Sequence, residues 1–267
     1  MTSRHYRAEG IVLRSFPTGE GALVVTLLQS DGSKLRAMAW GAQKLTSRMM
    51  GHLEPLTRVE MAVTRGRGMD SLAQVQSVES FTAVKSDLDA TARALYLVEL
   101  VDGFAAEGSA NPSLYQLFLA SLRSLAGSDQ SDVVIAHFQW QLLTVCGFMP
   151  ELFHCVECRR ELTPGDHRFS IDLGGVLCGQ CASTQPSAAP LSLPALKVLR
   201  HFHRSPALTS PRVRLSASLN AQLRGILDGT VRYWLDREVR SRRFMDQLDR
   251  KPAGAPMPSG HQREPKF

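Results

Sequence analysis

Four of the five cysteines stand in two close pairs, Cys155 with Cys158 and Cys178 with Cys181. Two residues inside each pair let a tight turn aim both thiolates at one ion, and the 19 residues between the pairs are typical of zinc ribbons. Four thiolates leave no coordination position for water, so the pattern predicts one structural Zn²⁺. The alternatives are a chance pattern and a redox pair, but neither motif has a thioredoxin-like strand and helix beside it.

Three further residues near these pairs could take part in metal or thiol chemistry. His154 and His167 lie close enough in the sequence to be rival ligands, but we expect both at the surface. Cys146 ends a strongly apolar stretch, and we expect it to be a small core residue within a helix.

Signals of catalysis are missing. The sequence contains no GxxxxGK[ST], GxSxG or HExxH motif, and its eight histidines form no recognisable triad with a serine or cysteine. We therefore expect a protein that binds and positions other molecules, and not an enzyme.

The elements that must position these residues show two sequence patterns, one typical of strands and one typical of helices. Over the first 80 residues, apolar and polar residues alternate in five short runs, near 11–15, 23–27, 34–40, 59–63 and 72–81, with turn signals between them. Residues 43–53 could hold a short helix. Five such strands with a helix before the fourth predict an OB-type barrel, and a plain five-stranded meander is the alternative.

Helical spacing begins after Val84, with Asp87 as a plausible N-cap. We expect helices near 88–104, 114–125, 132–146 and 192–203, and a last long one over 216–240. The fold class is thus α+β: a barrel over 1–82, a helical domain over 83–250 with the zinc module 153–183 inserted, and a tail over 251–267. The tail is rich in proline, glycine and charge, which predicts disorder.

Charge is unevenly distributed along the chain. The net charge is +6, with +3 over residues 1–80, −5 over 81–154 and +7 over 196–250. This pattern suggests an anionic partner, most commonly nucleic acid, contacted by selected parts of the molecule. No apolar run approaches the roughly 20 residues of a spanning helix, and the first ten residues lack the apolar core of a signal peptide. We expect a cytoplasmic protein.

The barrel carries the candidate DNA-binding cations. OB barrels bind single strands along one face and with the loops that join strands one and two and strands four and five. We expect phosphate contacts from six side chains: Lys34, Arg36, Lys44, Arg48, Arg65 and Arg67. Trp40 could offer a stacking surface, but we expect it in the barrel core.

A second basic group closes the last long helix. Arg242 and Arg243 stand directly before Phe244. Cations at a helix C-terminus complement the helix dipole, which is the simplest explanation. Arginines beside an aromatic ring could instead hold an acidic peptide with an aromatic end.

Several stretches resemble the bacterial recombination mediator family RecO. They are residues 9–14 (EGIVLR), 41–48 (GAQKLTSR), 53–56 (LEPL), 65–68 (RGRG), 146–152 (CGFMPEL), 169–178 (FSIDLGGVLC) and 241–244 (SRRF). The resemblance spans about residues 1–250 and is specific in combination. Gln43 departs from it, since the family usually has a base there.

The resemblance implies a non-enzymatic mediator of homologous recombination and DNA repair. Such proteins bind single- and double-stranded DNA, anneal complementary strands and act with RecR. They contact the acidic tail of single-strand-binding protein and help RecA replace it on DNA. The alternatives from other classes are a zinc-ribbon regulator that reads nucleic-acid sequence and a purely structural assembly partner.

Overall fold

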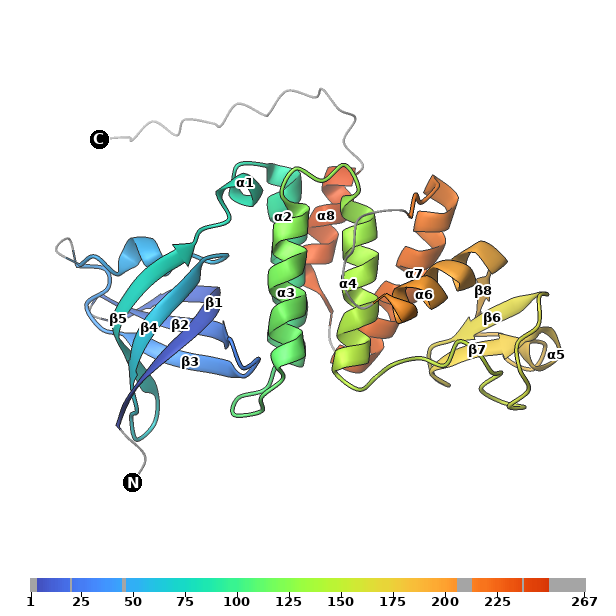
Figure 1. Cartoon of the computed structure of the whole chain (residues 1–267), viewed down its shortest axis with the longest axis horizontal. Helices are drawn as coiled ribbons and strands as arrows, with labels where there is room; N and C mark the ends of the chain where they lie inside the picture. The colour runs from blue at the N-terminus through green and yellow to red at the C-terminus, as the bar shows by residue number, and fades with distance from the viewer. Residues whose placement is uncertain (1–3, 20, 45–46, 206–212, 237, 250–267) are drawn as a thin grey trace, which may run out of the picture.

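The computed structural model describes residues 4–19, 21–44, 47–205, 213–236 and 238–249. A β-barrel lies at one end, helices form the middle, and a small cysteine-bearing sheet lies at the other end (Figure 1). The tail over 251–267, for which we predict disorder, lies outside the described residues. No described helix combines the length and the apolar character that crossing a membrane requires.

Five strands close the N-terminal barrel in the order β1-β2-β3-β5-β4. They are β1 (His5–Thr18), β2 (Ala22–Gln29), β3 (Lys34–Ala39), β4 (Arg58–Thr64) and β5 (Asp70–Glu79). Neighbours pair antiparallel except β3 and β5, whose short parallel contact closes the barrel. The α+β class with a five-stranded OB-type barrel is therefore confirmed.

Strand β1 is longer than expected because it pairs with two neighbours in succession. Its first half pairs with β4 and its second half with β2, and at Gly10 it pairs with both. A Cβ at Gly10 would lie 2.7 Å from the carbonyl oxygen of Leu28, so only glycine fits this crossing.

The prediction of a short helix over residues 43–53 is wrong in its extent. The structure has only a 3₁₀ turn, Met50–His52, within the described part of this segment. Gly41 adopts a left-handed conformation with φ 66°, which turns the chain sharply after β3. His52 then accepts the backbone N–H of Ser77 at 3.3 Å, which fastens the segment to β5.

The central helices begin at side-chain caps. Asp87 accepts the backbone N–H groups of Asp89 and Ala90 and starts α2 (Leu88–Phe104), as expected. Asn111 caps α3 (Pro112–Leu125) in the same way. Helix α4 (Ser131–Val145) is apolar on nearly all sides and is packed on two of them. A single turn, α1 (Thr82–Lys85), joins the barrel to α2.

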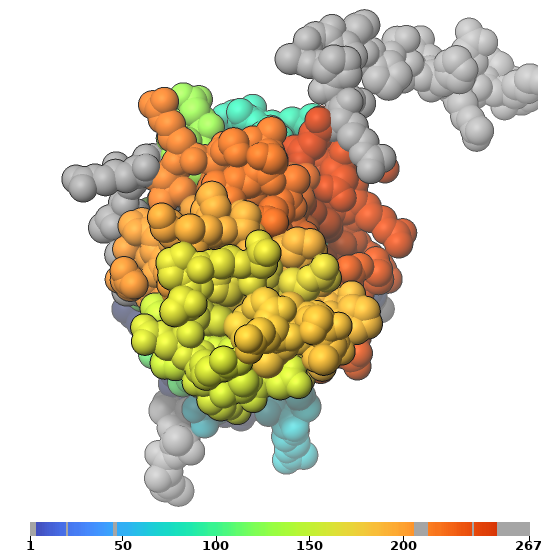
Figure 2. All heavy atoms as spheres, turned by 90° about the vertical axis from the view of Figure 1, so that its right-hand side faces the viewer, coloured from blue at the N-terminus to red at the C-terminus, as the bar shows by residue number. Residues whose placement is uncertain are grey.

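The cysteine-bearing module follows α4. It contains β6 (His167–Ser170), β7 (Gly175–Cys178), the short turn α5 (Gly179–Ala182) and β8 (Ala189–Leu191). β8 pairs with β6, so the end of the Ser/Ala/Pro-rich stretch over residues 183–190 belongs to the sheet. Figure 2 shows the module covering the end of the molecule away from the barrel.

The expected last long helix is two helices. After α6 (Leu193–Arg204), α7 (Ala217–Leu235) ends at Asp236, whose φ of 51° is left-handed, and α8 (Arg240–Asp249) runs back along α2. The carboxylate of Glu99 on α2 accepts the backbone N–H groups of Arg240 at 2.9 Å and Ser241 at 2.8 Å. This carboxylate caps α8 and fixes where it begins.

The barrel and the helices share one hydrophobic core. Three barrel residues, Ile11, Leu13 and Leu28, pack in the same cluster as the apolar faces of α2, α3 and α4. Polar contacts border this cluster: Tyr115 on α3 donates to Glu9 on β1 at 2.5 Å, and Arg123 on α3 pairs with Glu79 on β5 at 2.7 Å. The barrel is therefore fixed to the helices by apolar packing and by ion pairs.

Candidate metal centre and nucleic-acid interface

The four paired cysteines converge on one point. Their sulfur atoms all lie within 4.8 Å of one another, and Cys158 Sγ lies 3.9 Å from Cys178 Sγ. Cys155 and Cys158 lie in a tight turn closed by the Cys155 N–H, which donates to the carbonyl of Arg160 at 2.8 Å. Cys178 ends β7, and Cys181 lies one turn later in α5.

This donor set fits a tetrahedral metal. Thiolates bound to Zn²⁺ at about 2.3 Å would stand about 3.8 Å apart, close to the separation of Cys158 and Cys178. A disulfide needs about 2.05 Å, and all five cysteines are free. Hydrogen bonds support two of the sulfurs: Arg160 Nε donates to Cys158 Sγ, and the Cys178 N–H donates to Cys155 Sγ, both at 3.4 Å.

The Arg160 guanidinium also favours the thiolate form of a ligand. Its hydrogen bond lowers the pKa of Cys158 to about 6. A thiolate at neutral pH is the form that binds a metal ion. The positive φ of Arg159, 61°, lets the chain turn back so that Arg160 reaches this sulfur.

The two neighbouring histidines differ from each other. His154 is exposed, as expected. His167 is buried on β6, so its expected surface position is wrong. Alternation along a four-residue strand places it on the side facing the module's core, together with Phe169. Cys146 follows the last residue of α4 instead of lying inside it, and burial raises its thiol pKa to about 11.

Five of the six candidate DNA-binding cations are exposed on the barrel. Arg36 lies on β3, Lys44 and Arg48 follow it, and Arg65 and Arg67 lie in the β4–β5 loop. None of the five forms an ion pair with a carboxylate among the described residues. Asp70, just after this loop, pairs with Ala37, so the loop enters the sheet beside Arg36.

Lys34 is placed differently. Its ammonium group donates to the carbonyl of Asp102 on α2 at 2.5 Å and pairs with the carboxylate at 3.2 Å. Arg14 on β1 pairs with the same carboxylate at 3.0 Å. The side chain of Lys34 is thus committed to the contact between barrel and helix.

The expected core position of Trp40 is wrong. Trp40 lies directly after β3 and is 65% exposed. Leu35, Ala37 and Ala39 fill the barrel interior, and the residues between them face outward. The signal was present in the sequence, because Trp40 has the same parity as Arg36, a residue unsuited to a barrel core.

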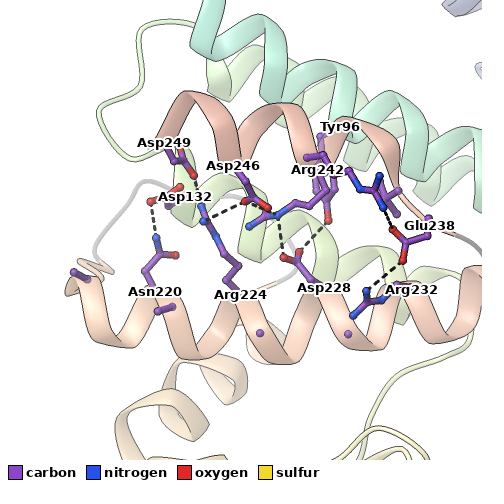
Figure 3. Close-up of a pocket in the computed structure, with 16 residues that line it drawn as sticks. Tyr96, Asp132, Asn220, Arg224, Asp228, Arg232, Glu238, Arg242, Asp246 and Asp249 are labelled. Carbon is purple, nitrogen blue, oxygen red and sulfur yellow. Dashed lines mark hydrogen bonds and ion pairs between the residues drawn. The ribbon is translucent and has the colours of Figure 1, made fainter. Parts of the chain in front are cut away.

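An open cleft of about 830 Å³ lies between α2, α7 and α8. Figure 3 shows charged side chains from α7 and α8 meeting across it. Arg242 Nε pairs with Asp228 at 3.1 Å and Asp246 at 3.3 Å, while its guanidinium lies over the ring of Tyr96 at 5.6 Å. Tyr96 donates to Asp228 at 3.1 Å, and burial raises its pKa, so it stays a neutral donor.

The three candidate peptide-binding residues differ in exposure and in their partners. Arg242 is directed into the cleft, Arg243 is exposed and pairs with Glu238 at 3.4 Å, and Phe244 is 42% exposed. Consecutive helix residues point about 100° apart, which explains the divergence. The group begins α8 instead of ending a long helix, so complementing a C-terminal dipole does not explain it.

Comparisons with known proteins cover nearly the whole chain. The family described as "Recombination protein O N terminal" matches residues 1–81, and "Recombination protein O C terminal" matches residues 85–243. These two matches follow the order of barrel, helices and cysteine module described above.

Several similar curated proteins carry the name "DNA repair protein RecO". The protein of Desulforudis audaxviator is 37% identical over 246 residues, which covers 92% of this chain and 98% of that protein. Those of Roseiflexus sp. and Bacillus pumilus are 34% and 33% identical, covering 93% and 91% of this chain and 87% and 94% of theirs. The family models and these relatives agree over both the barrel and the helices, and the chain therefore belongs to the RecO family.

Proposed function

We propose that this chain is a non-enzymatic mediator of homologous recombination in DNA repair. It binds single- and double-stranded DNA, anneals complementary strands and helps load RecA onto DNA coated by single-strand-binding protein. It acts with RecR, in the cytoplasm at the nucleoid. The name shared by its relatives supports the repair role.

One observation carries the DNA-binding part of this proposal. Five exposed cations, Arg36, Lys44, Arg48, Arg65 and Arg67, border the barrel with no carboxylate partner among the described residues. Unpaired cations can neutralise phosphates and release counterions, which needs no nucleotide hydrolysis. Lys34 is left out of this set because it holds Asp102.

The cysteine centre has a structural role in this proposal. Cys155, Cys158, Cys178 and Cys181 hold one Zn²⁺ with no position open for water or substrate. Bound there, the ion links the turn after α4 to the end of β7, and the module's fold depends on it.

The acidic tail of single-strand-binding protein is the proposed ligand of the α8 region. Arg243 and Phe244 offer an exposed cation and an exposed ring, while Arg242 holds the adjoining cleft in shape. Changing Arg243 and Phe244 together to Ala should weaken binding of the tail peptide. Undiminished binding in this variant eliminates the site.

Strand annealing tests the proposed function directly. Two complementary oligonucleotides coated with cognate single-strand-binding protein are mixed without nucleotide, and pairing is followed by fluorescence. We expect this chain to accelerate pairing. Binding to one duplex about a thousandfold tighter than to random DNA, without annealing, would instead show a regulator that reads sequence.

The salt dependence of binding locates the interface. Arg65→Ala/Arg67→Ala should reduce the slope of log K against log salt for single strands by about 1.4, roughly 0.7 for each lost phosphate contact. Lys197→Ala/Arg214→Ala removes two exposed cations that lie outside the barrel sequence and should leave the slope unchanged. Equal slopes in both double variants would refute the barrel interface.

A further inference from the structure

The outer face of β1, β2 and β3 carries exposed apolar side chains near the end that holds the β1–β2 hairpin. Phe16 is paired with Val24, and Val24 with Met38, so these three residues form one row across the sheet. Trp40 lies two residues beyond Met38 and so continues the outward alternation of β3 just past the end of the strand. Phe16 is 55% exposed and Trp40 is 65% exposed. We call Phe16, Val24, Met38 and Trp40 the aromatic face.

These side chains have no structural task that accounts for them. The barrel interior is filled by the residues between them, such as Val25, Ala37 and Ala39. The helical cluster takes Ile11, Leu13 and Leu28 from the same strands but neither Phe16 nor Trp40. Two large rings exposed to water on one sheet face indicate a partner with apolar surface of its own.

Cations border the aromatic face on two sides. The next row along the strands contains Arg14, Thr26 and Arg36, and Arg36 is exposed with no carboxylate partner among the described residues. At the other end, the Gln43 N–H donates to the carbonyl of Gly21 at 3.0 Å, which holds the turn after Trp40 against the β1–β2 hairpin. Lys44 belongs to this turn, beside Gly21 and Gly41.

The charge pattern selects the occupant. From Arg14 to Trp40, the outward residues of the described strands β1, β2 and β3 include basic and apolar side chains and no acidic one. Flat rings next to cations match a polymer that carries flat apolar groups and a negative backbone. Single-stranded nucleic acid has this chemistry, because its bases can stack on aromatic rings while its phosphates meet arginine and lysine.

Geometry favours a single strand over a duplex. Phe16 and Trp40 are separated by two strand spacings and one same-face step, about 12 Å. Bases in a duplex are stacked on each other about 3.4 Å apart and present only their edges in the grooves. Rings set into a sheet face at this spacing can stack only on bases that have left their neighbours.

We propose that the aromatic face is a base-stacking platform for single-stranded DNA, with Trp40 and Phe16 as its two rings and Arg36 and Lys44 as its phosphate contacts. This deepens the proposed DNA binding and rests on it. It assigns to this face contacts that only single strands can make, whereas the β4–β5 loop cations contact phosphates of either form.

Affinity for matched probes tests the platform in the full chain. Trp40→Ala should weaken binding of a thymidine 20-mer about tenfold, while Trp40→Phe, which keeps a ring, stays within about twofold. Binding of an abasic 20-mer and of a duplex should be the same for Trp40→Ala and wild type. Leu173→Ala, which removes an exposed apolar side chain from the cysteine module, is the matched control and should bind all probes normally.

Two affinity results overturn the proposal. One is a Trp40→Ala/Phe16→Ala variant that binds the thymidine 20-mer as well as wild type does. The other is equal weakening on the abasic probe, which would show a lost fold or phosphate contact instead of lost stacking. If wild type binds no probe at all, the proposed DNA-binding function itself has failed, which is a distinguishable outcome.

Tryptophan fluorescence gives an independent readout. Trp140 is buried and Trp234 lies on α7, so quenching by the thymidine 20-mer should come from Trp40 and disappear in Trp40→Phe. Full quenching in Trp40→Phe would contradict the platform. A change in self-association with unchanged DNA affinity in Trp40→Ala would also overturn it, in favour of a second copy of the chain as occupant.

Discussion

Cys178 links the two halves of the four-cysteine cluster. It ends β7, and its sulfur lies 3.9 Å from Cys158 while its backbone N–H donates to the Cys155 sulfur. Cys178→Ser should abolish stoichiometric zinc in the purified protein, as measured by elemental analysis. Cys146→Ser is the matched control, because Cys146 lies outside the cluster, and it should keep one equivalent. Full zinc retention in Cys178→Ser would overturn the four-cysteine assignment.

Arg242 and Arg243 are neighbours in sequence with different energetic roles. Arg242 is 13% exposed at its side chain and pairs with Asp228 and Asp246, whereas the Arg243 side chain is 80% exposed. Arg242→Met leaves Asp228 without its cation and should lower the free energy of unfolding by about 2 kcal/mol, as partly buried pairs do. Arg243→Met should change it by less than about 0.5 kcal/mol.

Urea unfolding of the two variants measures this difference. Wild type, Arg242→Met and Arg243→Met are compared at neutral pH and moderate salt, with m-values checked for equality. Equal stability of the two variants would show that the cleft network contributes no more than a surface pair.

Single residues also show which features the sequence predicts and which it does not. The cysteine spacing predicted the cluster because two-residue turns allow few arrangements. The usual burial of aromatic residues favours the core for Trp40, although its parity with Arg36 indicates the outward position that the structure shows. The commitment of Lys34 to Asp102 depends on two residues 68 positions apart, a pairing that no local pattern encodes.

Among the elements, β1 depends on ionic contacts with its neighbours. Glu9 on β1 receives hydrogen bonds from Arg58 on β4 at 2.9 Å and from Tyr115 on α3 at 2.5 Å. The Arg58 hydrogen bond is the main cause that lowers the pKa of Glu9 below its ordinary 4.5. The Arg123 hydrogen bond lowers the pKa of Glu79 on β5 in the same way.

These lowered pKa values predict loss of stability in acid. A carboxyl whose pKa is lower in the folded state stabilises the fold above its unfolded pKa, near 4.5, and stops doing so as the pH falls through the folded value. Glu9→Gln should therefore be less stable than wild type at pH 6, by about 1 kcal/mol. The difference should shrink progressively below about pH 4.5. A constant difference from pH 6 to pH 3 would contradict the role of this carboxylate.

Elements with strong local signals were predictable, and elements set by tertiary contacts were not. Asp87 caps α2 as expected, and Ser192 caps α6 at the start of the helix expected near 192–203, since a side-chain cap is a local feature. The sequence at the break between α7 and α8 contains no glycine or proline that would predict it. It follows from Asp236 adopting a left-handed conformation and from Glu99, a residue of α2, capping the next helix.

At the scale of the whole molecule, α4 separates two cores. One of its sides, with Val134, Phe138 and Leu142, packs with α2, α3 and the barrel residues Ile11, Leu13 and Leu28. Its other side, with Val133, Ala136 and Trp140, packs with α6, α7 and the cysteine module. The cysteines Cys155, Cys158, Cys178 and Cys181 belong only to the second core. The barrel and the four-cysteine cluster are therefore stabilised through different faces of one helix.

Removing the metal should consequently loosen one core and spare the other. With its thiolates unlinked, the module loses the constraint that joins residues 155–158 to residues 178–181, and the second core loses Cys155 and Leu177 as packed neighbours. We expect chelation to increase hydrogen exchange in the module, in α6 and in the Trp140 side of α4. Exchange in β1, β2 and β4 should stay unchanged.

Hydrogen exchange with mass spectrometry of the zinc-loaded and chelated full chain measures this outcome. The Cys178→Ser protein should show the same pattern without chelator, which separates loss of metal from effects of the reagent. If the barrel loses protection together with the module, α4 transmits the disturbance and the two cores act as one. In that case DNA binding by the barrel should also become zinc-dependent; with a spared barrel, the chelated protein should bind single-stranded DNA as tightly as the zinc-loaded form does.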